Sequence, residues 1–198
     1  MQSAIGRNLA CEAAARLYNR PVVEFHVGGG GTSAPLLTHY STHAQETAIS
    51  ISHSGNWVCA VAARRHQGLG IDVQTVEPRN VGGLTVFMDW NTLLATPAIA
   101  ASSNVATTLD RFTHLWTVWE AAVKCDGVTV LAGSTPAFTA LAPLCRPGTA
   151  HSWSAGKFQA HSQRLGVRHW LTVVAAGPVP QTIEVHFVEA QAALAGWA

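Results

Sequence analysis

The sequence is poor in charged residues. Only 12% of its 198 residues are Asp, Glu, Lys or Arg, about half the share of an average globular protein. This composition favours a compact protein with a well-buried core and is untypical of a disordered chain. The formal net charge is +1. There is thus no overall electrostatic attraction to nucleic acid or to an anionic membrane, and we expect neither as a partner.

The sequence also lacks a long apolar run and closely spaced cysteines. The longest strongly apolar stretch, residues 57–63, is far shorter than the roughly 20 residues that cross a bilayer. The N-terminal segment holds no apolar core of a signal peptide. The four cysteines are scattered without a CxxC pair, which is typical of reduced thiols and argues against a zinc site. We therefore expect a cytoplasmic protein.

Two segments carry helical signals. An apolar stripe at a spacing of four residues predicts a helix over residues 4–17, which Pro21 would end. A second helix is predicted over residues 110–126, where apolar residues lie nearly all round and Gly127 is a natural C-terminal cap. Residues 75–108 are irregular in pattern, with short helices expected around residues 87–94.

Alternating or continuous apolar runs predict strands. They cover residues 22–27, 48–53, 57–63, 69–73, 128–131, 169–176 and 183–187. The order helix, strand, glycine, strand, strand occurs twice, which indicates a duplicated unit. We therefore predict the α+β class: a pseudo-dimer of two similar α+β halves, residues 1–100 and 101–198, with the active site between them. Because one chain supplies both halves, we expect a monomer.

The second predicted helix carries two charged residues on one face. Glu120 and Lys124 are four residues apart and lie about one turn from each other. On an exposed helix they would form an ordinary surface ion pair worth a few tenths of a kcal/mol. On a helix this apolar, charged groups need partners. We favour a pair that faces a ligand, and the surface pair stays an alternative.

Two further polar residues stand in notable surroundings. Asp72 lies in a predicted strand whose neighbouring residues are apolar or glycine, and buried acids are usually paired or bind a metal. Its alternative partner is an arginine such as Arg64. His53 lies where a strand meets a turn, a place where a histidine often makes only a backbone hydrogen bond. A serine hydrolase that pairs Ser52 or Ser54 with His53 is a weaker alternative, because neighbouring strand residues point to opposite faces.

Together these residues favour phosphoryl transfer. Asp72 and Glu120 suit a hard divalent cation such as Mg²⁺, which takes a few carboxylates and leaves positions for water and phosphate oxygens. Lys124 and His53 supply donors for phosphate charge. Positioning and charge neutralisation carry the catalysis in this class of reaction.

Three segments, in this order, resemble the motifs of Sfp-type 4′-phosphopantetheinyl transferases, the holo-carrier-protein synthases. They are residues 51–57 (ISHSGNW), 70–73 (GIDV) and 116–124 (WTVWEAAVK). The family patterns run roughly (N/S)ISHS, (V/I)G(I/V)D(I/V)E and WxxKEAxxK. Residues 6–10 (GRNLA) also resemble the family's early helix, and residues 170–176 its late core strand. The resemblance thus covers nearly the whole chain, and the family fold is a pseudo-dimer with the active site between its halves.

The resemblance implies transfer of 4′-phosphopantetheine from coenzyme A to a serine of an acyl or peptidyl carrier protein, in fatty-acid, polyketide or peptide synthesis. Asp72, Glu120 and Gln74 would hold Mg²⁺ on the pyrophosphate of coenzyme A. Glu120, or a water that it orients, would accept the proton of the carrier serine.

The resemblance also implies contacts to coenzyme A and to the carrier. His53 and Lys124 would contact phosphate oxygens. Ser52, in the same motif as His53, and Arg7, near the start of the chain, would bind coenzyme A as well. The carrier protein would dock near residues 75–108 and the second helix.

The sequence departs from the family pattern at two of these positions. Gln74 stands where the family usually has a third acid, and Trp119 stands where it has lysine. If the family geometry holds, a Trp119→Lys variant should be as active as the wild type or more active. The departures leave a second interpretation open, a degenerate, non-catalytic family member that acts as a binding or assembly protein in a biosynthetic pathway.

Overall fold

The computed structural model describes most of the chain. The described residues are 2–29, 35–39, 47–64, 68–77, 105–127, 150–155, 158–177 and 183–189. They combine helices with antiparallel sheets, which confirms the predicted α+β class. Within these residues, neither of the long helices is apolar enough over a sufficient length to cross a membrane.

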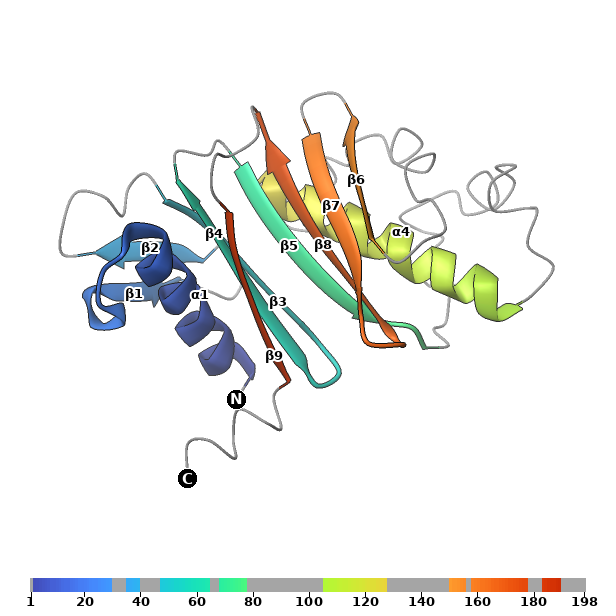
Figure 1. Cartoon of the computed structure of the whole chain (residues 1–198), viewed down its shortest axis with the longest axis horizontal. Helices are drawn as coiled ribbons and strands as arrows, with labels where there is room; N and C mark the ends of the chain where they lie inside the picture. The colour runs from blue at the N-terminus through green and yellow to red at the C-terminus, as the bar shows by residue number, and fades with distance from the viewer. Residues whose placement is uncertain are drawn as a thin grey trace.

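The elements follow one another in an order that begins with a helix and ends with a strand. They are α1 (Gln2–Tyr18), a 3₁₀ turn (Val22–Glu24), β1 (Phe25–Gly28), β2 (Leu36–His39), β3 (Thr47–Ser54), β4 (Trp57–Arg64), β5 (Gly68–Thr75), α4 (Val105–Cys125), β6 (Ala150–Ala155), β7 (Phe158–Leu165), β8 (His169–Ala176) and β9 (Ile183–Glu189). Figure 1 shows α1 beside β3, β4 and β9, and α4 beside the other large sheet.

Each of the two larger sheets takes a strand from the other part of the chain. The strand orders are β3-β4-β9 and β5-β8-β7-β6, and all of these pairs are antiparallel. β9, close to the C-terminus, pairs with β4 (Figure 1). β5, from the first part of the chain, pairs with β8. The two parts of the chain are therefore joined by an exchange of strands.

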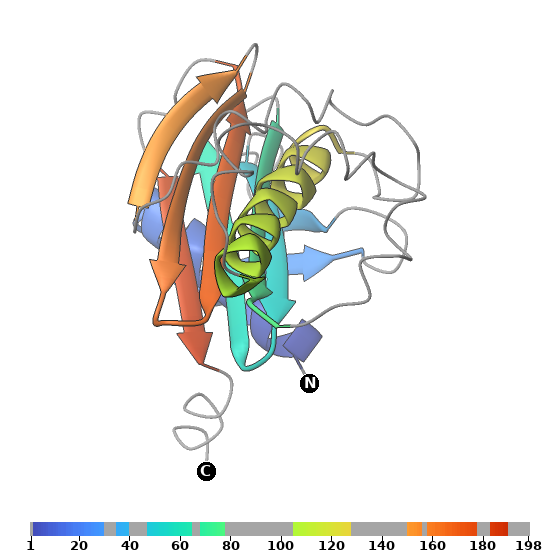
Figure 2. The ribbon, with the colours of Figure 1, turned by 90° about the vertical axis from the view of Figure 1, so that its right-hand side faces the viewer.

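Two apolar cores hold these layers together. One lies between α1 and the three-stranded sheet and includes Leu9, Ala13 and Ala60. The other joins the two larger sheets and includes Val61 of β4 and Ile71 of β5. Helix α4 lies across the four-stranded sheet (Figure 2), against β5, β8 and β7. The side chains on this face of β5 therefore lie between the helix and the sheet.

Several boundaries differ from those that the sequence predicts. Pro21 does not end α1: the helix stops at Tyr18, because Asn19 adopts a left-handed conformation with φ 53°. The N–H of Arg20 then bonds to Ala15 O at 2.9 Å, a common way to close a helix. The predicted cap at Gly127 is confirmed, with φ 70°.

The strand predictions hold where the pattern is apolar and fail where it is polar. The strand predicted at residues 169–176 is β8, whereas the start of the one predicted at residues 22–27 is a 3₁₀ turn. β2, β6 and β7 were not predicted, because β2 is short and β6 and β7 are rich in Ser, His and Gln. The short helices expected at residues 87–94 and the strand expected at residues 128–131 lie outside the described residues.

Candidate functional site

The backbone of β5 lies directly against α4 because of two glycines. Residues 68, 70, 72 and 74 point to the same side of the strand. A Cβ atom at Gly70 would overlap the carbonyl oxygen of Ala121, and one at Gly68 would overlap that of Cys125. Only glycine permits this approach. It places the next two residues on that side of β5, Asp72 and Gln74, beside the polar residues of α4.

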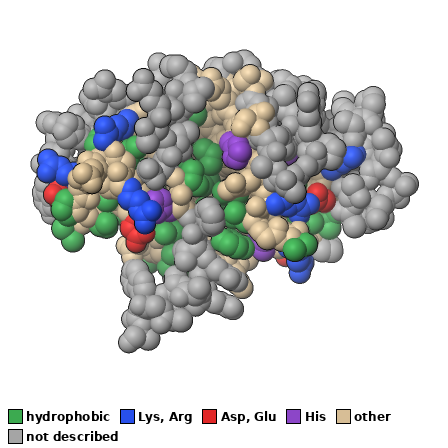
Figure 3. Space-filling model, in the orientation of Figure 1, with side chains coloured by type: hydrophobic (Ala, Val, Ile, Leu, Met, Phe, Trp, Pro, Cys, Tyr) green, Lys and Arg blue, Asp and Glu red, His purple; other side chains and the backbone are tan. Residues whose placement is uncertain are grey.

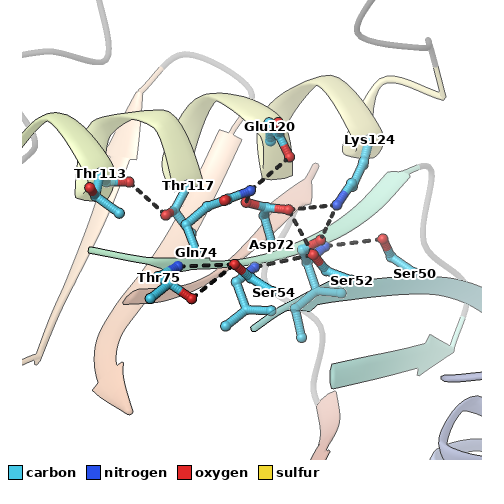
Figure 4. A network of polar contacts seen from close by, with 12 residues as sticks. Ser50, Ser52, Ser54, Asp72, Gln74, Thr75, Thr113, Thr117, Glu120 and Lys124 are labelled. Atoms are coloured by element: carbon cyan, nitrogen blue, oxygen red, sulfur yellow. Dashed lines mark hydrogen bonds and ion pairs between the residues drawn. The ribbon is translucent and has the colours of Figure 1, made fainter. Parts of the chain in front are cut away.

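Asp72 is fully buried and is surrounded by donors from three elements (Figure 4). Lys124 Nζ lies 2.7 Å from Asp72 Oδ1 and also donates to the carbonyl oxygen of Ile71 at 3.1 Å. Ser52 Oγ donates to the same Oδ1 at 2.7 Å. Gln74 Nε2 donates to Oδ2 at 3.0 Å. Both carboxylate oxygens therefore have partners, which offsets the cost of burying the charge.

Glu120 meets this group through the side chain of Gln74. Gln74 Nε2 lies 3.3 Å from Glu120 Oε2, so one amide nitrogen contacts both carboxylates (Figure 4). Burial raises the pKa of Glu120 from 4.5 to about 8, and the negative charge of Asp72 acts in the same direction. The positive charge of Lys124 lowers this pKa and offsets part of the shift. Without a cation beside it, the Glu120 carboxyl group therefore keeps its proton near neutral pH.

A row of serines on β3 lies beside the free edge of β5. Alternate hydroxyls of β3 accept hydrogen bonds from alternate N–H groups of β5. The pairs are Ser50 with Ile71 at 3.1 Å, Ser52 with Val73 at 3.2 Å and Ser54 with Thr75 at 3.0 Å. Three backbone donors that would otherwise lack a strand partner are thereby satisfied. We call these three residues the serine row.

His53 and Arg7 lie on another side of the sheet. His53 is exposed and pairs with Val58, whose side chain belongs to the core under α1. It therefore points away from the face that carries Ser52 and its partner Asp72. Arg7, on α1, donates to the carbonyl oxygen of Gly29 at 2.9 Å. The structure thus brings together five of the predicted site residues and leaves these two apart from them.

The opposite orientation of Ser52 and His53 also argues against the hydrolase alternative that would pair Ser52 or Ser54 with His53. A nucleophile and its base must lie within hydrogen-bond distance, and neighbouring residues of β3 face opposite sides. Ser54 shares the face of Ser52, and its hydroxyl lies 3.1 Å from that of Thr75.

The thiol of Cys59, across the β3–β4 pair from Ser52, is unreactive. Cys59 of β4 pairs with Ser52 and is fully buried. Burial and, to a smaller extent, the charge of Asp72 raise the pKa of Cys59 to about 12, and the charge of Lys124 offsets part of this rise. The thiol therefore stays protonated, and the chemistry of the group rests on its carboxylates and its amine.

The oxygens of Asp72 and Glu120 are suitably placed to share a cation. Asp72 Oδ2 and Glu120 Oε2 both accept from the amide nitrogen of Gln74. A cation at the place of this nitrogen would lie close to both carboxyl groups. Among the described residues, no three or more His, Cys, Asp or Glu side chains gather in one place, but Mg²⁺ commonly takes only one or two carboxylates. The amide of Gln74 can present its oxygen instead of its nitrogen by a half-turn. The residues present therefore fit a divalent cation.

Trp119, which stands where the family pattern has lysine, is part of the core. It is 2% exposed, and its ring lies 4.9 Å from that of Trp116, centroid to centroid. The position cannot hold a cation that reaches toward solvent without disturbing this packing.

Comparisons with known proteins do not assign the chain to a family. No protein-family model matches it, and no curated protein matches it either.

Proposed function

We propose that the protein transfers 4′-phosphopantetheine from coenzyme A to a serine of an acyl or peptidyl carrier protein, in a reaction that depends on Mg²⁺. The observation that carries the proposal is the meeting of Asp72, Glu120 and Lys124 at one place between β5 and α4. These are the residues that the motif resemblance selects, and they come from segments far apart in the sequence.

In this proposal Asp72, Glu120 and Gln74 hold the cation. When bound, Mg²⁺ would neutralise part of the negative charge on the pyrophosphate of coenzyme A. Lys124 is 28% exposed at its side chain, so its ammonium group can both pair with Asp72 and meet a phosphate at the surface of the site. His53 and Arg7 would have to reach a different part of coenzyme A, since they lie on the α1 side of the sheet.

Glu120 is the proton acceptor of the proposed reaction. The serine oxygen of the carrier forms a bond to the β-phosphorus of coenzyme A, and the bond from that phosphorus to the bridging oxygen breaks. The serine proton goes to Glu120, and adenosine 3′,5′-bisphosphate leaves. With the cation bound beside it, the positive charge would favour the ionised form of Glu120, which is the form that can accept a proton.

We also propose that the fold is a pseudo-dimer of two related halves. The order α1, β3, β4, β5 is matched by α4, β7, β8, β9. In each set a helix packs on an antiparallel hairpin, and the last strand pairs with the hairpin of the other set. This reciprocal exchange is what a duplicated unit with internal twofold symmetry would produce.

The proposal is tested by intact-mass spectrometry of apo carrier proteins incubated with the protein, coenzyme A and Mg²⁺. The expected result is a mass gain equal to one phosphopantetheine arm, which is lost with EDTA and lost when the carrier serine is replaced by alanine. Asp72→Asn, which keeps the shape of the side chain and removes its charge, should also lose the gain. Absence of a gain on any carrier would contradict the proposal.

A non-catalytic binding protein is the second candidate. It is favoured by the burial of Trp119 at the lysine position, and by the hydrogen bonds that Ser52, Gln74 and Lys124 already donate to Asp72. In that case calorimetry would detect binding of coenzyme A or of a carrier protein, and no carrier would gain mass.

A further inference from the structure

Ser52 belongs to the segment whose resemblance implies a contact to coenzyme A, but the structure shows its hydroxyl engaged elsewhere. Only 6% of the residue is exposed. Its Oγ donates to Asp72 Oδ1 at 2.7 Å and accepts from the N–H of Val73 at 3.2 Å. A serine hydroxyl has one proton to donate. In this arrangement Ser52 has no proton left for a phosphate oxygen.

We propose that Ser52 is a positioning residue for Asp72 and not a contact to coenzyme A. Its hydroxyl fixes the rotation of the Asp72 carboxylate, so that Oδ1 stays with Ser52 and Lys124 while Oδ2 faces Gln74 and Glu120. This role rests on the proposed function, because it matters for a cation that Asp72 and Glu120 share.

The rigidity of Ser52 distinguishes it from the other partner of Oδ1. Lys124 holds Oδ1 from α4 with a long, flexible side chain that is 28% exposed, and such an ammonium can follow a carboxylate that turns. Ser52 has a short side chain, and the N–H of Val73 holds its oxygen in place. Neighbours of this kind commonly orient the ligands of a metal site and tune its affinity.

The serine row supplies a matched control for this proposal. Ser50 is 5% exposed, lies on the same face of β3, and accepts from the N–H of Ile71 at 3.1 Å. Ser50→Ala therefore removes the same kind of backbone contact from the same buried place as Ser52→Ala. Of these two serines, Ser52 alone donates a hydrogen bond to Asp72. The difference between the two variants measures the contact to the carboxylate.

The experiment compares the wild type, Ser50→Ala and Ser52→Ala. Mn²⁺ binding is measured by electron paramagnetic resonance with and without coenzyme A, and thermal unfolding is measured by circular dichroism. Ser52→Ala is expected to bind Mn²⁺ about tenfold more weakly, whereas Ser50→Ala binds it like the wild type. In transfer assays at saturating Mg²⁺, Ser52→Ala should keep the KM for coenzyme A. Ser52→Thr, which keeps the hydroxyl, should restore Mn²⁺ affinity.

Two results would overturn the proposal. One is equal Mn²⁺ affinity in Ser52→Ala and Ser50→Ala. The other is a raised KM for coenzyme A in Ser52→Ala with unchanged Mn²⁺ affinity, which would make Ser52 a substrate contact. If Ser52→Ala is too unstable to purify, Ser52→Cys takes its place, because a thiol is a weaker donor and should give an intermediate affinity.

Failure of the proposed function gives a different pattern. If no carrier gains mass but Ser52→Ala still weakens Mn²⁺ binding relative to Ser50→Ala, the positioning role stands and the transferase is wrong. If the wild type binds no Mn²⁺ with or without coenzyme A, both the positioning role and the shared cation site are wrong.

Discussion

At the scale of single residues, Asp72 and Glu120 are two carboxylates with different surroundings. Asp72 accepts from Ser52 and Lys124 at one oxygen and from Gln74 at the other. Glu120 has the amide of Gln74 and lies in a buried setting that raises its pKa to about 8. Burial therefore favours the protonated form of Glu120.

The raised pKa of Glu120 makes folding stability depend on pH. In the unfolded chain the carboxyl has its ordinary pKa of 4.5, and in the folded protein it is about 8. Between these values the folded state keeps a proton that the unfolded state has released. The free energy of unfolding therefore falls as pH rises through this window. In EDTA, the melting temperature of the wild type should fall from about pH 5 to about pH 8, and Glu120→Gln should show a flatter profile.

The control for this pH experiment is Glu77→Gln. Glu77 is exposed and lies beyond the end of β5, so its variant should keep the slope of the wild type. An equal slope in Glu120→Gln and the wild type would show that Glu120 is not the titrating group.

At the scale of elements, the contact between β5 and α4 decides whether the site exists. The strand reaches the helix backbone through Gly68 and Gly70, and the two elements are separated by a long stretch of sequence. The helix carries Glu120 and Lys124, and the strand carries Asp72. A change that moves the helix away from the strand would separate these groups without altering any of them.

Gly70→Ala should therefore lower both stability and cation affinity. The added Cβ would overlap the carbonyl oxygen of Ala121, and helix backbone cannot move aside as a flexible side chain can. We expect a loss of about 1–3 kcal/mol, the usual range for overpacking, together with weaker Mn²⁺ binding. Denaturant unfolding and Mn²⁺ titration measure the two effects.

Gly28→Ala is the matched control for this substitution. Gly28 also lies in a strand, and a Cβ there would meet no atom within 4 Å. Both properties should stay close to those of the wild type. Equal stability of the two alanine variants would contradict the close approach of β5 and α4.

Trp119 contributes to the packing of α4, because its ring lies against that of Trp116 on the same helix. The family pattern would favour Trp119→Lys as a tolerated change, but the ring is 2% exposed and lies against Trp116. Replacing it with lysine removes a large buried ring and buries a charge. We expect a loss of more than about 3 kcal/mol, measured by denaturant unfolding. Trp119→Phe, which keeps an aromatic ring, should lose less, and a Trp119→Lys variant as stable as Trp119→Phe would show that position 119 tolerates a charge.

At the scale of the whole molecule, strand exchange makes the two parts of the chain depend on each other. The three-stranded sheet needs β9, which pairs with β4, and the four-stranded sheet needs β5, which pairs with β8. Without β9, β4 would present an unpaired edge, and such edges favour aggregation.

We therefore expect fragments 1–100 and 101–198 to be unfolded or aggregated when expressed alone, and to recover structure when expressed together. Circular dichroism and co-purification through a tag on one fragment measure this. A stable fragment 1–100 with cooperative unfolding would contradict the mutual dependence of the two sheets.

The local pattern of the sequence determined the α+β class, the position of α4 and most apolar strands. It also selected Asp72, Glu120 and Lys124 as the chemical group. Such features depend on periodicity and on polar residues in apolar runs, which neighbouring residues decide. The polar strands β6 and β7 were not predicted, because their places come from pairing with β8 rather than from their own pattern.

Only the tertiary structure decided how these residues meet. It shows that Gln74 joins the two carboxylates, that Ser52 turns toward Asp72, and that His53 lies on the other face of β3. It also shows that β5 pairs with β8 and that β9 pairs with β4, so each larger sheet contains a strand from the other part of the chain. These contacts join residues far apart in the chain and depend on the approach of α4 to the backbone of β5. A local sequence pattern cannot predict the distance between α4 and β5, because this distance is set by how the two elements pack.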